Sequence, residues 1–85
     1  MFYVYVLKSC LGGNLYTGHT ADLRKRLEEH NSGKVASTRG RVPFELVYYE
    51  ASRNLQDAIR RERYLKTTYG HRYVRNRLKH DLWPT

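Results

Sequence analysis

The sequence predicts a small α+β domain built on a three-stranded antiparallel sheet flanked by helices. Three segments are rich in β-branched and aromatic residues, a glycine-rich turn joins the first two, and helical patterns follow the second and third. The expected order is therefore β-β-α-β-α-α. A chain of 85 residues is the size of one domain. We place this domain at residues 1–80, followed by a C-terminal tail at residues 81–85, whose Trp83 and Pro84 are expected to fray or to dock on the surface.

Strands are expected at residues 2–8, 15–18 and 44–50, from the segments FYVYVLK, LYTG and FELVYYE. Residues 11–14 hold two glycines and predict a tight turn between the first two strands, which makes them a hairpin. A basic loop at residues 34–43 precedes the third strand and is expected to be mobile.

Three helical segments are expected. The first covers residues 21–31, the second follows a cap at residue 52 or 54 and ends at about residue 66, and the third covers residues 71–79. Thr20 is the expected N-cap of the first, and either Ser52 or Asn54 that of the second. Residues 67–70 are expected to break the chain between the second helix and the third, which is rich in Arg and Lys.

Composition and charge narrow the classes of function. Sixteen Lys and Arg against eight Asp and Glu give a net charge of +8. This charge favours nucleic acid, because neutralised phosphates release counterions; an anionic membrane surface is the second reading, and solubility alone the third. The hydrophobic share of 40% excludes a disordered basic tail.

Cellular location is addressed by three further features of the sequence. No apolar run approaches the roughly 18 residues of a membrane span, and no signal peptide pattern opens the chain, so export is not expected. A single cysteine, Cys10, excludes an internal disulfide and a cysteine-rich zinc site. We therefore expect a reducing, cytoplasmic location.

Polar side chains fall on the inward faces of the first two helices. Helical phase places Arg26 and His30, one turn apart, on or beside the apolar stripe of the first helix, and Glu62 at the centre of the apolar face of the second. A carboxylate aimed at a sheet is costly unless it is paired, hydrogen-bonded or bound to a metal. An ion pair with Lys66 is the structural alternative for Glu62, and capping of the helix C-terminus is the alternative for His30.

These residue types suit the cleavage of a phosphodiester. An arginine stabilises the added negative charge on a pentavalent phosphorus, and a glutamate holds a divalent cation that polarises the phosphate. A histidine or tyrosine takes or shuttles a proton from water.

The order and spacing of these residues resemble the GIY-YIG nuclease superfamily, and in particular its small stand-alone bacterial members. The matching pieces are Tyr3-Val4-Tyr5, Tyr16-Thr17-Gly18, Arg26 ten residues after Tyr16, His30 four residues later, and the A-x-x-x-E spacing of Ala58 and Glu62. The strings LYTGHTADLRKRLEEHNSGK, PFELVYYE and RRERYLK extend the resemblance to roughly residues 2–78. Two positions depart from the motifs, because Tyr3 replaces the glycine of the first triplet and Thr17 the isoleucine of the second.

The resemblance implies a metal-dependent endonuclease that hydrolyses DNA phosphodiester bonds with Mg²⁺ or Mn²⁺, and that could be structure-specific or act in DNA repair or recombination. The residues at the family's catalytic positions are Tyr5, Tyr16, Arg26, His30 and Glu62. Among these, Glu62 is the expected metal ligand and Tyr16 the better candidate for orienting or deprotonating the attacking water, while Tyr5 holds the phosphate or shares a proton relay. Some relatives use a late asparagine, for which Asn76 is the nearest candidate.

Other residues are expected to contact the substrate. They are Gly18, which lets the backbone approach a phosphate, His19, Lys34, Arg39, Arg41, Lys66 and Arg72, with Arg75, Arg77 and Lys79 beside Arg72. The alternative for the basic residues is a solvated face.

The expected partner is DNA, with no membrane; a homodimer or a protein partner stays open. The alternative functions are a non-catalytic nucleic-acid-binding module that kept the GIY-YIG fold, and a small basic interaction or membrane-surface protein.

Overall fold

A three-stranded antiparallel sheet in the order β2-β1-β3 forms the centre of the computed structural model, which describes residues 1–82. The central strand β1 (Phe2–Ser9) pairs with both β2 (Leu15–Thr20) and β3 (Phe44–Ser52). The predicted α+β fold is confirmed. Both outer strands run two residues past their predicted ends, because Thr20 and Ser52 still find partners on β1.

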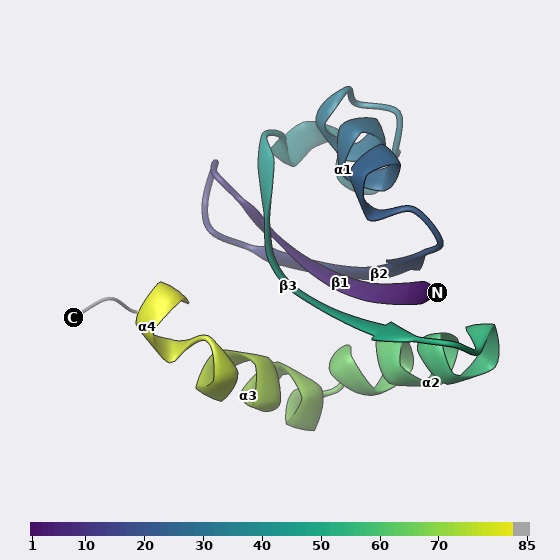
Figure 1. Cartoon of the computed structure of the whole chain (residues 1–85). Coiled ribbons are helices and arrows are strands. Elements are labelled where there is room, and N and C mark those ends of the chain that lie inside the picture. Colours follow the sequence, from purple (N-terminus) through teal and green to yellow (C-terminus); the bar gives the residue numbers. More distant parts are fainter. Residues whose placement is uncertain (83–85) are drawn as a thin grey trace.

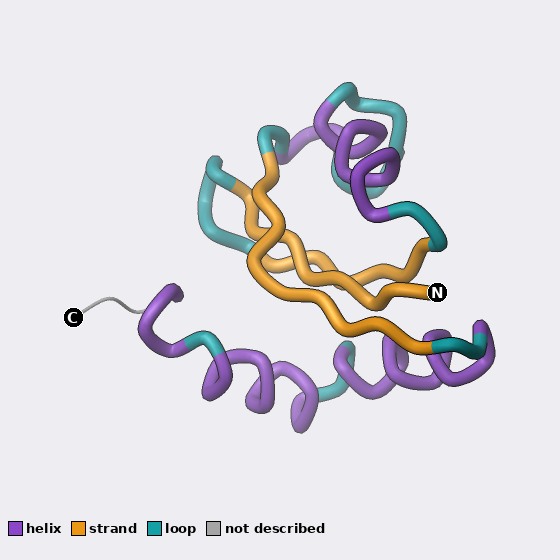
Figure 2. The backbone as a smooth tube through the Cα atoms, in the orientation of Figure 1, coloured by secondary structure: helices purple, strands orange, loops and turns teal. Residues whose placement is uncertain are grey.

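Helices cover both faces of this sheet (Figure 1, and Figure 2 in the same view). One face carries α1 (Leu23–Asn31) and the short 3₁₀ helix Arg39–Arg41. The other carries α2 (Leu55–Leu65) and α3 (Thr68–Arg77), with the four-residue α4 (Lys79–Leu82) after them. No helix within residues 1–82 has both the length and the apolar composition needed to cross a membrane.

Alternation along β1 divides the core into two halves, because successive side chains of a strand point to opposite faces. Tyr5 and Leu7 pack on the α1 side with Phe44. Val4 and Val6 pack on the other side with apolar residues of α2 and α3, namely Ala58, Leu65 and Val74. Functional side chains from α1 and from α2 therefore approach the sheet from opposite faces.

The first helix begins later than predicted, and Thr20 does not cap it. Thr20 still belongs to β2, where its hydroxyl accepts a hydrogen bond from the Asp22 N–H at 3.1 Å. The N-cap is Asp22, whose carboxylate accepts from the Lys25 N–H at 3.1 Å. The strand thus continues through the residue that the sequence pattern assigned to the helix.

The second helix is capped by Asn54, which decides between the two candidates. The Asn54 side chain accepts from the backbone N–H groups of Gln56 and Asp57. Ser52 is still paired with Phe2 in the sheet, so it is too early in the chain to cap.

The predicted break at residues 67–70 is shorter in the structure and lies at Lys66 and Thr67, between α2 and α3. Thr67 is the N-cap of α3, and its hydroxyl accepts from the Gly70 N–H at 3.1 Å. Gly70 lies inside α3 and against the end of α2, where a Cβ would stand 2.1 Å from the Tyr64 carbonyl oxygen. The glycine therefore permits a close helix–helix contact and does not end a helix.

A short helix, α4, follows α3 and extends beyond residue 79, where the predicted helical pattern ends. α4 includes residues 81 and 82, which the sequence pattern placed in the tail. Trp83 and Pro84, which were expected to fray or dock, lie outside the described residues.

The loop at residues 34–43 is anchored, although its composition predicted mobility. Thr38, which belongs to this loop, is fully buried. The Ser9 hydroxyl donates to the Arg41 carbonyl at 2.6 Å, and the Cys10 N–H donates to the Pro43 carbonyl at 2.8 Å. These contacts tie the last residue of the short 3₁₀ helix, and the segment just after it, to the end of β1.

Candidate active site

The Tyr5 phenol crosses from the central strand over its neighbour β2. The residue opposite Tyr5 on β2 is Gly18, and a Cβ there would lie 2.5 Å from Tyr5 Oη and 2.7 Å from Cζ. The space that a side chain would take at Gly18 is thus filled by the phenol. This is the structural reason for a glycine at this place, and a close approach of phosphate to its backbone stays a prediction.

Gly18→Ala is expected to destabilise the fold by about 1–3 kcal/mol, because the buried Tyr5 ring must move to make room. Gly40→Ala is the matched control, since nothing lies within 4 Å of a Cβ at Gly40. Urea denaturation of both variants measures the difference. Equal unfolding free energies for the two would contradict the close contact between Tyr5 and Gly18.

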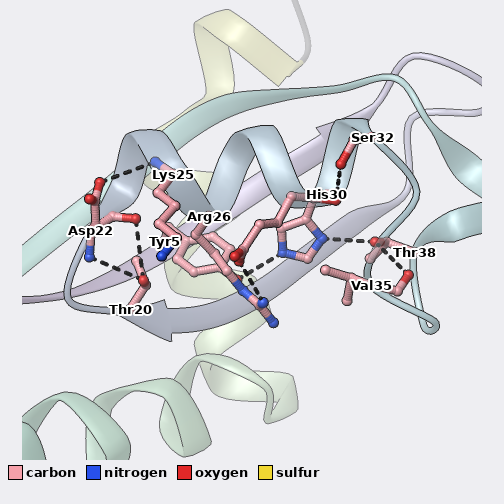
Figure 3. A network of polar contacts seen from close by, with 10 residues as sticks. Tyr5, Thr20, Asp22, Lys25, Arg26, His30, Ser32, Val35 and Thr38 are labelled. Carbon is pink, nitrogen blue, oxygen red and sulfur yellow. Dashed lines mark hydrogen bonds and ion pairs between the residues drawn. The ribbon is translucent and has the colours of Figure 1, made fainter.

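A buried polar network joins Tyr5 to α1 and to the loop after it (Figure 3). The Tyr5 hydroxyl lies 2.9 Å from His30 Nε2, and His30 Nδ1 lies 2.8 Å from the Thr38 hydroxyl. Arg26 Nε donates to Tyr5 Oη at 3.4 Å. His30 is fully buried, so the phase argument placed it on the correct face. Both its ring nitrogens contact side chains, which removes capping of the helix end as its role.

Burial fixes the protonation states in this network. Burial raises the pKa of Tyr5, while the hydrogen bond and charge of Arg26 lower it in part. The pKa of His30 is lowered, first by burial and then by the charge of Arg26. At neutral pH Tyr5 is therefore a neutral phenol and His30 a neutral imidazole.

Tyr16 joins the same cluster through its ring. It lies on β2, half-buried, with its ring centroid 5.0 Å from that of His30 and 6.4 Å from that of Tyr5. Within residues 1–82 its hydroxyl has no hydrogen-bond partner. Tyr16 is thus the phenol of the pair that is not committed to the His30 network.

Arg26 stands at the boundary between this buried network and solvent. Its side chain is 35% exposed, and Nη1 donates to Glu29 Oε1 at 3.0 Å. It lines a hollow of about 360 Å³ between the end of β2 and the start of α1. The other residues that line this hollow are His19, Thr20, Ala21, Asp22, Lys25 and Glu29.

Glu62 approaches β2 from the α2 side of the sheet. Its Oε1 lies 2.5 Å from His19 Nδ1 and its Oε2 lies 2.6 Å from Lys66 Nζ. Burial raises the pKa of Glu62, but the hydrogen bonds from Lys66 and His19 outweigh it and hold the pKa below its usual range. The ion pair offered as the structural alternative is therefore formed, and His19 completes it. The expected substrate contact of Lys66 competes with this pair.

The network around Arg26 and the ion pairs of Glu62 come together at the β2 edge of the sheet. His19, which contacts Glu62, lines the same hollow as Arg26. Burial is the main cause of the raised pKa of Tyr5, Arg26 lowers that pKa in part, and the charges of Tyr16 and Glu62 each add to the rise. The Arg26 and Glu62 side chains are thus linked through His19 at one polar edge of the sheet.

The predicted metal ligand can be tested against this donor set. Within the part of the chain that the structure describes, no group of three or more His, Cys, Asp and Glu could hold a metal ion. Glu62 offers one carboxylate whose side chain is 16% exposed. Mg²⁺ keeps several waters and commonly takes one or two carboxylates plus substrate phosphates. The residues fit an ion of this kind and do not fit an all-protein cage.

The predicted basic contacts do not form one surface. Lys34 and Arg39 are exposed on the α1 side, where Arg41 is held by its Nη2 hydrogen bond to the Ser37 carbonyl at 2.8 Å. Arg72, with the other basic residues of its cluster, belongs to the helices on the opposite face of the sheet. Asn76 is exposed on that side as well.

Thr38 is the residue of this network that sequence reasoning missed. It lies in a segment of small and basic residues without helical or strand periodicity, so nothing in the pattern marks it. Its burial follows from the path of the loop, which passes over the end of α1.

Comparisons with known proteins agree with the fold. A family model described as the GIY-YIG catalytic domain matches residues 1–77. UPF0213 proteins of Streptococcus agalactiae and Clostridium perfringens are 49% and 51% identical over 65 and 67 residues, covering 75% and 78% of this chain and 73% and 71% of theirs. The solution NMR structure of the UPF0213 protein BH0048 from Bacillus halodurans is similar, with a TM-score of 0.53 and 37% identity, covering 87% of this chain and 82% of that one.

Proposed function

The chain belongs to the GIY-YIG family, and from this membership we propose that it is a metal-dependent endonuclease that hydrolyses DNA phosphodiester bonds. The proposal rests on Arg26, whose guanidinium contacts the Tyr5 hydroxyl on one side and lines an open hollow on the other. A cation in this place can bind a phosphate and stabilise the charge that develops on it.

The phenols and His30 divide the remaining tasks in this proposal. Tyr16 orients the attacking water and assists its deprotonation, since its hydroxyl is uncommitted within residues 1–82. Tyr5 keeps its proton, and its oxygen accepts from Arg26 Nε and so positions the guanidinium that binds the phosphate. The neutral His30 contacts the Tyr5 hydroxyl through Nε2 and fixes the position of the phenol.

Glu62 is the residue that would hold Mg²⁺ or Mn²⁺. Such an ion, when bound, polarises the phosphate and stabilises the leaving oxygen. For the carboxylate to take this role, it must exchange its contacts with His19 and Lys66 for a metal ligand bond. The low pKa of Glu62 keeps the carboxylate ionised for that exchange.

The proposed substrate is DNA, in a repair or structure-specific setting, and the proposed location is the cytoplasm. The charge of +8 and the exposed Lys34 and Arg39 support a polyanionic substrate. The exposed free thiol of Cys10 supports a reducing compartment.

A non-catalytic nucleic-acid-binding module is the second candidate. It is favoured by one observation, that both oxygens of Glu62 are engaged by His19 and Lys66. Incubation of plasmid and branched DNA with the protein, with Mg²⁺ and with Mn²⁺, separates the two. Nicks support the endonuclease, whereas a mobility shift without nicks under either metal supports the binding module.

Binding to duplex DNA is expected to weaken with salt less steeply when Lys34 and Arg39 are both replaced by alanine. Each neutralised phosphate contributes about 0.9 to the slope of log K against log salt, so the slope falls by about 2. Arg60→Ala with Arg63→Ala on α2 removes the same charge from exposed positions not assigned to DNA. Fluorescence anisotropy at several salt concentrations measures the slopes, and equal slopes for the two double variants would count against the loop contact.

A further inference from the structure

Four side chains form one chain of hydrogen bonds with a definite direction, in the order Arg26, Tyr5, His30 and Thr38. Arg26 Nε can only donate, and it contacts Tyr5 Oη. At the other end, the Thr38 hydroxyl lies 3.4 Å from the Val35 carbonyl, which can only accept. Between these ends, Tyr5 contacts His30 Nε2 and Thr38 contacts His30 Nδ1.

Only one arrangement of protons satisfies every donor in this chain. If Thr38 donated to His30 Nδ1, then Nε2 would carry the proton and donate to Tyr5 Oη. Tyr5 Oη would then accept from both His30 and Arg26, and its own proton would have no acceptor in a buried place. The reverse arrangement has Tyr5 donating to Nε2, Nδ1 donating to Thr38, and Thr38 donating to Val35, so each donor is used.

We propose that Thr38 is a positioning residue of the proposed nuclease site, which fixes His30 in the Nδ1–H tautomer and thereby makes Nε2 an acceptor for the Tyr5 proton. Thr38 is fully buried, so water does not replace its hydroxyl. With Nε2 as the acceptor, the Tyr5 oxygen presents its lone pairs toward Arg26. The loop after α1 therefore sets the orientation of the phenol next to the reacting phosphate.

The rest of the fold holds Thr38 in this place. The Thr38 N–H donates to the Val35 carbonyl at 3.1 Å, and the Thr38 carbonyl accepts from the Arg41 N–H at 3.0 Å. The Arg41 carbonyl in turn accepts from the Ser9 hydroxyl. The backbone of Thr38 is thus held on both sides, which keeps its hydroxyl next to His30 Nδ1, and the partner of one ring nitrogen sets the tautomer of the imidazole.

Nitrogen NMR of the full chain, labelled with ¹⁵N-histidine, tests the tautomer without DNA. His30→Gln identifies the signals by their loss. We expect wild type to show a pyrrole-type Nδ1 and a pyridine-type Nε2 for His30. Thr38→Val keeps the shape but removes the hydroxyl, so we expect a mixture of tautomers or the Nε2–H form, while Thr38→Ser keeps the wild-type pattern. An Nε2–H tautomer in wild type, or an unchanged pattern in Thr38→Val, overturns the proposal.

Cleavage kinetics test the consequence, which rests on the proposed function. Thr38→Val is expected to lower the cleavage rate by about 10- to 100-fold, the loss seen when a metal-binding histidine loses its hydrogen-bond partner. Thr38→Ser is expected to restore the rate. A changed tautomer with an unchanged rate removes Thr38 from the mechanism. If wild type cuts no DNA, the proposed function fails, and the NMR result still decides the tautomer. Circular dichroism confirms folding, and Thr38→Ala supplies a second variant without the hydroxyl if Thr38→Val unfolds.

Discussion

Arg26→Ala is expected to lower the rate of DNA cleavage by about 10²–10³-fold, the cost of removing one preorganised group that stabilises transition-state charge. The guanidinium lies between the Tyr5 hydroxyl and the open hollow, so it can contact a phosphate without rearrangement of the buried network. Single-turnover cleavage of a labelled substrate measures the effect. The fold should stay intact, because Arg26 is 35% exposed and its ion pair with Glu29 is near the surface.

Two variants sharpen the Arg26 prediction. Arg24→Ala removes an exposed arginine from the same helix and is expected to leave the cleavage rate close to that of wild type. Arg26→Lys keeps the charge but loses the planar group that bonds two oxygens at once, so it should restore the rate only in part. A rate for Arg26→Ala equal to that for Arg24→Ala would exclude Arg26 from the chemistry.

Glu62→Gln is expected to remove metal-stimulated cleavage, lowering the rate by about 100-fold or more, because a metal ion contributes several kcal/mol of charge stabilisation. The amide has the shape of the carboxylate but is a much weaker ligand for Mg²⁺ and Mn²⁺. Cleavage rates across a range of Mn²⁺ concentrations, together with Mn²⁺ binding followed by water-proton relaxation, measure the two effects separately.

Glu28→Gln is the matched control for Glu62→Gln. It removes the same charge from an exposed position on α1. Loss of the contacts from His19 and Lys66 also changes stability in Glu62→Gln. Because the folded pKa of Glu62 lies below its usual range, the stability from these contacts is present above the unfolded pKa and is lost as pH falls through the folded pKa. Full Mn²⁺ binding by Glu62→Gln would show that the ion sits elsewhere.

The sequence predicts β1 well because its β-branched and aromatic residues are buried on both faces of the sheet. FYVYVLK places Tyr5 on one side of β1 and its neighbours Val4 and Val6 on the other, and the structure buries all three. Helical phase identified His30 as inward-facing for the same reason. Local periodicity is sufficient in these cases, because each side chain needs only the face on which it lies.

Contacts between distant segments could not be predicted in this way. The phase of α2 shows that Glu62 faces the sheet, but not that it meets His19, 43 residues earlier, at the β2 edge. The Tyr5 phenol fills the space that a side chain at Gly18 would take, and Thr38 contacts His30, which contacts Tyr5. Such contacts depend on the packing of the whole domain and leave no periodic trace in the sequence.

The termini of the helices show a second limit. Thr20 has the residue type of an N-cap but remains in a strand, because its partner Tyr3 extends the sheet. Gly70 has the residue type of a helix end but lies within α3, because α2 packs against it. In both places tertiary contacts override a local preference.

The central claim, that this GIY-YIG chain cuts DNA at the β2 edge of its sheet, is tested most directly by one assay. Supercoiled plasmid and branched DNA are incubated with wild type, Arg26→Ala and Glu62→Gln, each with Mg²⁺, with Mn²⁺ and with a chelator. The account predicts nicks from wild type with metal, none with the chelator, and strongly reduced cleavage by both variants. Uncut DNA with wild type under either metal, or equal cleavage by all three proteins, would contradict it.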